Sequence, residues 1–245
     1  MFDHEKLQVY DKSLIFAAKV TGWTATWDKK HALVDHLSRA TESILLNLAE
    51  AVRQGGIPAR LQTADYAIGS SLECAGCLDV ARIKELLTPQ CCQEEKRLLC
   101  DITKMLIGLR KSWGYSKVQE EQVSYSIKSK KGMPESRFHH EGLEVYRSAL
   151  NFIEWFVSQS KVRELSNRLF RQLDEAGTSV VLNIAEGNGR YAELDHDRFL
   201  QIANGAAVKA SVYLDLAVKR ELLGEAEADG GKKIFRKIGI MVAGF

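Results

Sequence analysis

The chain has 245 residues, of which 45% are apolar and 27% are charged, with only three prolines. This composition is typical of a folded protein and excludes a disordered chain, because disordered segments are poor in apolar residues. The formal net charge is only +2. The chain as a whole therefore has no field that would draw it to nucleic acid or to an acidic membrane, and any such binding must be local.

The N-terminal segment and the cysteines indicate a cellular compartment. The segment Met1–Lys6 is too polar for a secretory signal, and no apolar run approaches the roughly 20 residues that a membrane span needs. The five cysteines, all between Cys74 and Cys100, are odd in number and do not form a disulfide framework of the secreted kind. We expect a cytoplasmic protein with reduced thiols and no contact with a membrane.

A self-similarity at an offset of 136 residues divides the chain into two copies of one unit. The segment Phe2–Phe16 recurs as Phe138–Phe152 without a gap, and the match continues through the rest of each copy. Such a repeat is the signature of a duplicated structural unit. We predict a first unit at residues 1–111, a polar linker at 112–137 and a second unit at 138–245, with net charges of +1, +2 and −1. Neither unit is basic.

The first unit contains four amphipathic runs, whose apolar residues recur at spacings of three and four as on one face of an α-helix. Gly55, Gly56 and Pro58 separate the second run from the third, and Thr88 and Pro89 separate the third from the fourth, where Pro89 suits a first helical turn. The third run is rich in small side chains, which permits a neighbouring backbone to come close. In chain order the apolar positions are Leu7, Tyr10, Leu14, Ala17; Leu33, Leu37, Ala40, Ile44, Leu48; Ala64, Ala67, Ser71, Ala75, Leu78; Leu98, Ile102, Met105 and Leu109.

The linker and the second unit follow. Residues 112–137 contain a lysine run with few large apolar residues, which is linker composition. The second unit repeats the four runs at 143–153, 169–184, 200–214 and 234–245. Short connections between long amphipathic helices place neighbours antiparallel. We therefore predict an all-α protein made of two tandem up-and-down antiparallel four-helix bundles.

The sequence resembles a family of small bacterial four-helix-bundle proteins that includes those encoded by intervening sequences within 23S ribosomal RNA genes. The opening Phe138–Tyr146, the motif Asn183–Arg190 and the segment Phe199–Gly205 carry this resemblance. The first unit keeps Asn47–Glu50 but has Ala51 where the family pattern has glycine, and Gln54 where the second unit has Arg190. The resemblance implies units that form rings, commonly pentamers. One branch is similar to the accessory protein of diversity-generating retroelements, in which the bundle binds nucleic acid and a reverse transcriptase.

Polar residues beside the apolar stripe of the second helix recur in both units. They are Asn47 and Glu50 in the first unit, and Asn183 and Glu186 in the second. They are candidate binding residues, but the interpretation we favour is structural, because buried polar atoms are nearly always hydrogen bonded and can fix the register of a bundle.

Two further patterns have a chemical and a structural interpretation. Cys74 and Cys77 form a C-x-x-C pair that could hold zinc or a redox couple, but a second hook at zinc spacing is absent, and small buried side chains are the favoured interpretation. His4 with Glu5, and His140 with Glu141, are adjacent in sequence and do not share a helix face, so we expect a structural helix start. No nucleotide-binding, hydrolase or zinc-protease motif is present. We predict no enzyme activity, no cofactor and no metal.

Local cations are the candidates for binding RNA or DNA phosphates. They are Lys128, Lys130 and Lys131 in the linker, and Arg190 and Arg198 near the end of the second helix of the second unit. A lysine run of this kind is more often a solvated linker.

Three functional hypotheses follow. The first is a non-catalytic oligomerising scaffold or adaptor that presents helical surfaces to a protein partner. The second is a nucleic-acid-binding accessory protein, which could act with a reverse transcriptase, and the third is metal or thiol chemistry at the cysteines. The duplication predicts a homo-oligomer with an even number of bundles, or an intramolecular pseudo-dimer.

Overall fold

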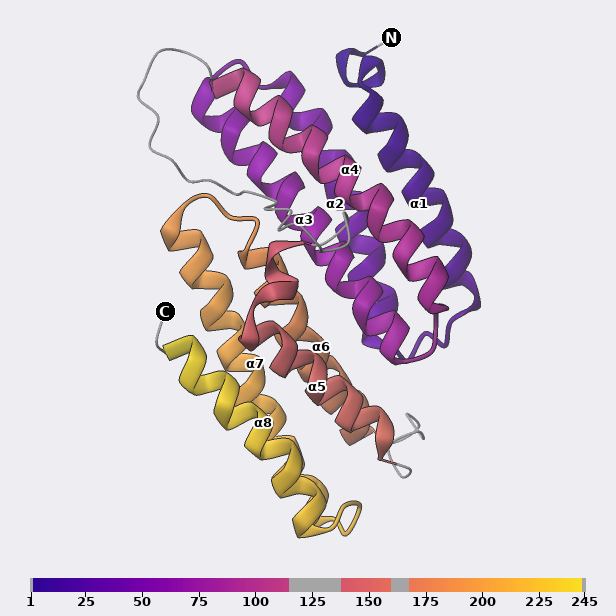
Figure 1. Ribbon diagram of the computed structural model, residues 1–245, viewed down its shortest axis with the longest axis vertical. Coiled ribbons are helices and arrows are strands. Elements are labelled where there is room, and N and C mark those ends of the chain that lie inside the picture. The colour runs from indigo at the N-terminus through magenta and orange to yellow at the C-terminus, as the bar shows by residue number, and fades with distance from the viewer. Residues whose placement is uncertain (1, 115–137, 160–167, 244–245) are drawn as a thin grey trace.

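The computed structural model describes residues 2–114, 138–159 and 168–243 (Figure 1). Within these ranges the chain forms α-helices, two short 3-10 helices and connecting turns, with no β-strand. The prediction of an all-α fold is confirmed. No helix in these ranges has the length and apolar character needed to cross a membrane.

The first unit has a 3-10 turn η1 (Asp3–Lys6) followed by α1 (Gln8–Thr26), α2 (Ala32–Arg53), α3 (Ile57–Ile83) and α4 (Pro89–Gly114). Pro58 lies in the first turn of α3 and Pro89 begins α4, as the break signals predicted. Helix α4 continues to Gly114, three residues into the segment that the sequence indicated as linker. The candidate cations Lys128, Lys130 and Lys131 lie outside the described residues.

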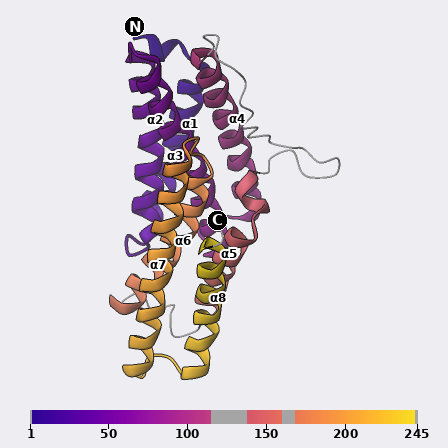
Figure 2. The same cartoon turned by 90° about the vertical axis from the view of Figure 1, so that its left-hand side faces the viewer.

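The second unit repeats this order with η2 (His139–Gly142), α5 (Glu144–Ser158), α6 (Arg168–Gly187), α7 (Glu193–Lys219) and α8 (Glu225–Ala243). In each unit successive helices pack against one another and the first packs against the fourth. Both units are therefore up-and-down four-helix bundles, and they lie side by side with their long axes shifted relative to each other (Figures 1 and 2).

Most predicted core positions are buried, but the stripe predicted for α1 is not the one that faces the core. All five apolar positions named for α2 and for α3 are buried. In α1 the buried residues are Val9, Ser13, Phe16 and Val20, whereas Leu14 is 45% exposed. Because α1 carries apolar residues on more than one side, periodicity alone allows several stripes, and contacts with α2 and α4 select among them.

The two units pack through different surfaces. The largest contact joins α3 of the first unit to α6 of the second, and α2 and α5 add smaller contacts to it. A two-fold relation between the units would bring α2 against α7 as extensively, and the described residues show no comparable contact. The interface is therefore heterologous. We call the covered surface of α2, α3 and α4 the acceptor face, and the covering surface of η2, α5 and α6 the donor face.

Glycines allow this close packing. A Cβ atom on Gly189 would lie 2.8 Å from the Cα of Gly69, and one on Gly76 would lie 3.2 Å from Leu182 and Ala185 of α6. Since the first distance is shorter than real Cβ contacts, backbone meets backbone here only because neither position has a side chain. The small-residue run of α3 thus receives a neighbour from the other unit.

Candidate functional site at the junction of the two units

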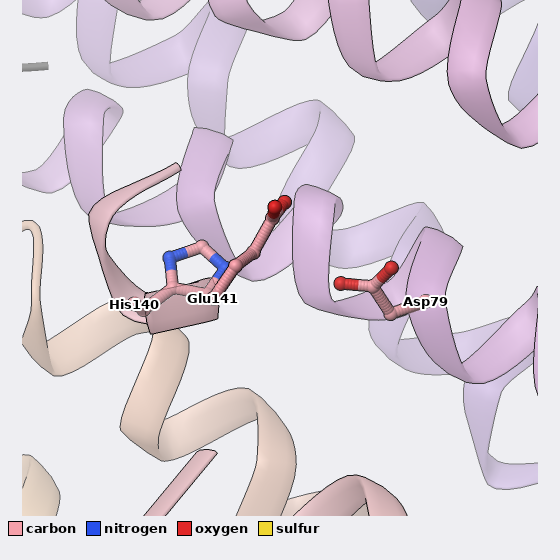
Figure 3. Close-up of side chains that lie close together, drawn as sticks. All are labelled: Asp79, His140 and Glu141. Carbon is pink, nitrogen blue, oxygen red and sulfur yellow. The ribbon is translucent and has the colours of Figure 1, made fainter. Parts of the chain in front are cut away.

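A buried polar cluster lies where the two units meet. Asp79 comes from α3 and Lys96 from α4, whereas Glu141 comes from η2 and Tyr146 from α5 of the second unit. The Lys96 ammonium donates a hydrogen bond to Oδ1 of Asp79 at 2.6 Å and lies 2.6 Å from Oε1 of Glu141. The Tyr146 hydroxyl donates to Oδ2 of Asp79 at 2.9 Å. Figure 3 shows the carboxylates of Asp79 and Glu141 directed toward a common region.

Lys96 stays charged although it is buried. Burial disfavours its charged form, but attraction by Asp79 and Glu141, with the hydrogen bonds they accept, outweighs this and raises the Lys96 pKa above its usual value. One cation thus pairs with two carboxylates that belong to different units.

His140 completes the cluster. Its ring is fully buried, is stacked on Phe138 and meets the Tyr146 ring edge to face. Burial, with the positive charges of Lys96 and His139, holds the His140 pKa well below its usual range, so the imidazole is neutral at physiological pH. Neither ring nitrogen has a hydrogen-bond partner among the described residues.

Asp79, His140 and Glu141 together have the donor atoms of a cation site. Their candidate ligand atoms lie within 4.8 Å of one another, and carboxylate and imidazole suit a divalent ion such as Zn²⁺ or Mn²⁺. The Lys96 ammonium, however, lies between the two carboxylates and is the cation that they bind. The adjoining cavity, lined by Ile68, Leu72 and His140 among others, has about 40 Å³, which is too small for an organic cofactor.

A second polar group at the junction surrounds Glu186 of α6. Its carboxylate pairs with Arg190, whose guanidinium also lies over the ring of Tyr66 in the first unit, 5.0 Å from its centroid. Burial raises the Glu186 pKa, and the charge of Glu73 raises it further against the opposing effect of Arg190, to about 7. Glu73 itself lies 3.5 Å from Nδ1 of His36. The carboxyl group of Glu186 therefore titrates near neutral pH inside the interface.

A third contact lies at the end of α3. Lys84 and Asp174 form an ion pair of 2.5 Å whose side chains are almost completely buried, and Lys84 also lies 3.4 Å from the Thr178 hydroxyl. Asp174 and Thr178 belong to α6, so this pair also joins the two units.

The structure places the candidate residues of α2 and α6 in two environments. Asn47 and Asn183 donate to the backbone carbonyls of Ser43 and Ser179, one turn earlier in the same helix. Glu50 accepts hydrogen bonds from Arg53 and Gln54 at the exposed end of α2, whereas its counterpart Glu186 lies in the junction.

The two candidate arginines differ in burial, and so do the five cysteines. Arg190 is buried and paired, but Arg198 is exposed on α7. Four of the five cysteines, Cys74, Cys77, Cys92 and Cys100, are buried free thiols, and Cys91 is partly exposed. Burial raises the pKa of each of these thiols, which disfavours the reactive thiolate.

Sequence reasoning missed a groove of cations between the units. The loop before α2, the first turns of α2 and the first turns of α6 line a space of about 590 Å³. Its cations are Lys29, Lys30, Arg39, Arg168 and Arg171, and its acidic members are Asp35 and Glu175. The two contributing segments are about 130 residues apart in sequence and neither is a basic run. Only the packing of the two units gathers these charges.

Comparison with protein families matches both units. The family described as 23S rRNA-intervening sequence protein matches residues 5–108 and again residues 141–244. These two ranges support the tandem duplication inferred from the internal repeat. Searches of curated proteins and of solved structures found no match to the chain.

Replacing Lys96 by methionine tests the junction cluster. We expect Lys96→Met to lower the free energy of unfolding by about 3–5 kcal/mol, because it leaves two buried carboxylates without their cation. The matched control is Lys232→Met, which removes the same residue from the exposed pair with Asp215 in the second unit and should cost less than about 1 kcal/mol. Urea unfolding of both variants measures the difference, and equal effects would contradict the role assigned to Lys96.

The carboxyl group of Glu186 predicts a pH dependence. Because its folded pKa is raised to about 7, its contribution to stability is complete below the unfolded value near 4.5 and is lost as the pH rises through 7. We expect the stability of the wild-type protein relative to Glu186→Gln to fall by on the order of 2 kcal/mol between pH 5 and pH 8. Glu50→Gln is the control, because the hydrogen bond from Arg53 lowers the Glu50 pKa and keeps that group ionised over this range. A pH-independent difference for Glu186→Gln would show that Glu186 is charged throughout.

Proposed function

We propose that this chain, which belongs to the 23S rRNA-intervening sequence protein family, is a non-catalytic scaffold of the cytoplasm that oligomerises and presents helical surfaces to a protein partner. The observation that carries this proposal is an apolar row left exposed on α7. Val208, Val212 and Leu216 lie one and two turns apart on this helix and are 58%, 50% and 38% exposed.

The counterparts of this row define what it can bind. At the offset of 136 residues, Val208, Val212 and Leu216 correspond to Leu72, Gly76 and Val80 of α3. All three of these residues are buried, and Gly76 lies directly against α6 of the second unit. The same surface of the fold is therefore a helix-binding surface in one unit and is open in the other. A contiguous exposed apolar row is a mark of a protein interaction site.

The polar clusters support a structural role over a catalytic one. Asp79, Glu141, Asp174 and Glu186 each face a cation of the same chain at the junction. An acid or base in catalysis must reach a substrate, and these groups lie in the contact between the two units.

Site-specific photocrosslinking in cells tests the scaffold function. With a benzoylphenylalanine at position 212, we expect ultraviolet light to join the chain to a defined protein, which mass spectrometry identifies. The control position is Lys233 of α8, whose counterpart Arg97 remains exposed in the first unit. The absence of any adduct specific to position 212 would overturn the proposal.

The groove of cations favours a second candidate function, binding of nucleic acid. Four cations of the groove form no ion pair with another described residue and are therefore available to phosphates. They are Lys29, Lys30, Arg168 and Arg171. Neutralisation of phosphates by such a cluster releases counterions and makes the affinity depend on salt.

Fluorescence anisotropy with labelled single-stranded RNA and DNA tests this second function. We expect binding at low salt that weakens as salt is raised, and a loss of at least about tenfold in affinity for the double variant Lys30→Glu with Arg171→Glu. The control Lys233→Glu with Arg236→Glu changes the charge equally on the outer side of α8. Equal losses in both double variants would assign the binding to net charge and not to the groove.

A further inference from the structure

We propose that the groove of cations between the two units is a binding site for a compact polyphosphate group, such as that of a nucleoside triphosphate, and that the bound group ties the two units together. This inference rests on the second candidate function, since both require the groove to bind phosphates, and it names the ligand as a short chain of phosphates. The groove lies where α2 of the acceptor face meets α6 of the donor face.

The groove is more positive than the chain as a whole. Its five cations and two carboxylates leave a net charge of +3 with its histidine counted as neutral, against +2 for all 245 residues. Arg39 pairs with Asp35 on its own helix at 2.8 Å, and the other four cations form no ion pair with a described residue. A hollow lined mainly by charges of one sign concentrates a multivalent ion of the opposite sign.

The two units supply these cations from positions that do not correspond. Arg171 of the second unit stands where the first has Asp35, and Arg39 of the first stands where the second has Glu175. The duplication therefore did not give each unit a site of this kind. Because the groove forms only when the units are docked, we expect one bound polyphosphate per chain.

The distribution of the cations makes the ligand a link between the units. Like charges that line one space from opposite sides repel, so the groove opposes docking of the units until an anion fills it. A ligand that contacts both sides removes this repulsion. Since it binds the docked form, it stabilises that form in proportion to its concentration relative to Kd.

Backbone groups and arginine side chains add donors to the site. Helix α2 begins at Ala32, which lines the groove, and the side chain of its N-cap residue His31 makes no cap hydrogen bond. The first N–H groups of a helix have no partner within the helix, and its positive end favours anions. The guanidinium groups of Arg168 and Arg171 suit two phosphate oxygens each. A chain of phosphates has the acceptor oxygens that these donors require.

The lining favours a compact phosphate group over a strand of nucleic acid. Among the described residues that line the groove, none is phenylalanine, tyrosine or tryptophan, whereas proteins that bind single strands stack the bases on aromatic rings. The cations also share one space of about 590 Å³, which is the size of a small-molecule site. The groove is therefore suited to recognise phosphates and to leave an attached base or sugar without specific contacts.

Isothermal titration calorimetry of the full chain with sodium tripolyphosphate tests the site. At physiological ionic strength we expect one site per chain and a Tm that rises with the concentration of tripolyphosphate. Orthophosphate at equal ionic strength should bind at least about tenfold more weakly, because it reaches fewer of the cations. Absence of tripolyphosphate binding, or binding no tighter than that of orthophosphate, would overturn the inference.

Two variants test whether one ligand contacts both units. Lys30→Gln removes a cation of the first unit and Arg171→Gln one of the second, and each should lower the affinity for tripolyphosphate about tenfold. The matched control is Lys209→Gln with Arg220→Gln, which removes one lysine and one arginine from exposed positions on α7 and at its end and should leave the affinity nearly unchanged. A loss in only one of the two groove variants would show that the ligand contacts a single unit, against the inference.

Nucleotides and RNA identify the source of the polyphosphate group. ATP and GTP should bind alike, because the lining has no ring on which to stack the base. An RNA with a 5′-triphosphate should bind more tightly than the same RNA with a 5′-hydroxyl end. An affinity for the triphosphate RNA well above that for ATP assigns the site to the end of a transcript, and an equal or lower affinity assigns it to a free nucleotide.

The same ligands separate failure of this inference from failure of the second candidate function. If the two RNAs bind alike and tripolyphosphate does not compete with them, nucleic-acid binding stands and the polyphosphate site fails. If neither RNA nor tripolyphosphate binds, both fail.

Discussion

The buried ammonium group of Lys96 is the interaction on which the relation of the two units depends. It binds Asp79 of its own unit and Glu141 of the other, within a contact that leaves the three side chains only 10–16% exposed. Burial of three charged groups is tolerated only when all of them are in place, because the loss of one leaves an uncompensated charge. The cluster therefore specifies one orientation and register of the second unit. Lys84 and Asp174 add the same kind of constraint at the end of α3.

The position of α3 also explains why the two copies differ in sequence. Within its own unit α3 packs against α2 and α4, and it is covered from outside by α5 and α6. A helix surrounded in this way requires small side chains where a neighbouring backbone comes close. Cys77 and Gly76 occupy such positions in α3, whereas the corresponding residues of α7 are Tyr213 and Val212, which are not fully buried. Packing thus explains why Cys77 stands where α7 has a tyrosine.

Part of the junction could have been found in the sequence. Asp79 and Asp215 recur at the offset of 136 residues within runs of small apolar residues, and Lys96 and Lys232 recur in the fourth helix. A charged residue repeated inside a buried stripe requires a partner, and this signal was available. That Glu141 is this partner could not be predicted. The residue precedes a helix of the other unit, and no pattern in one sequence shows which surface of one bundle contacts the next bundle. The prediction of which residues of α1 face the core was wrong for a related reason. A helix with apolar residues on several sides has more than one possible buried face, and contacts with its neighbours select one.

The sequence by itself determined the all-α class, the duplication, the breaks between helices and the buried positions of α2, α3, α6 and α7. These are local properties, because the period of 3.6 residues and the conformational limits of proline and glycine act within a few turns of the chain. Only the tertiary structure decided that Arg190 is buried, that cations from two distant segments share a groove, and that Glu50 and Glu186 differ in environment although both copies encode them. The physical reason is that burial and charge pairing of a side chain depend on which helix packs against it. The packing of whole helical surfaces determines which helix that is.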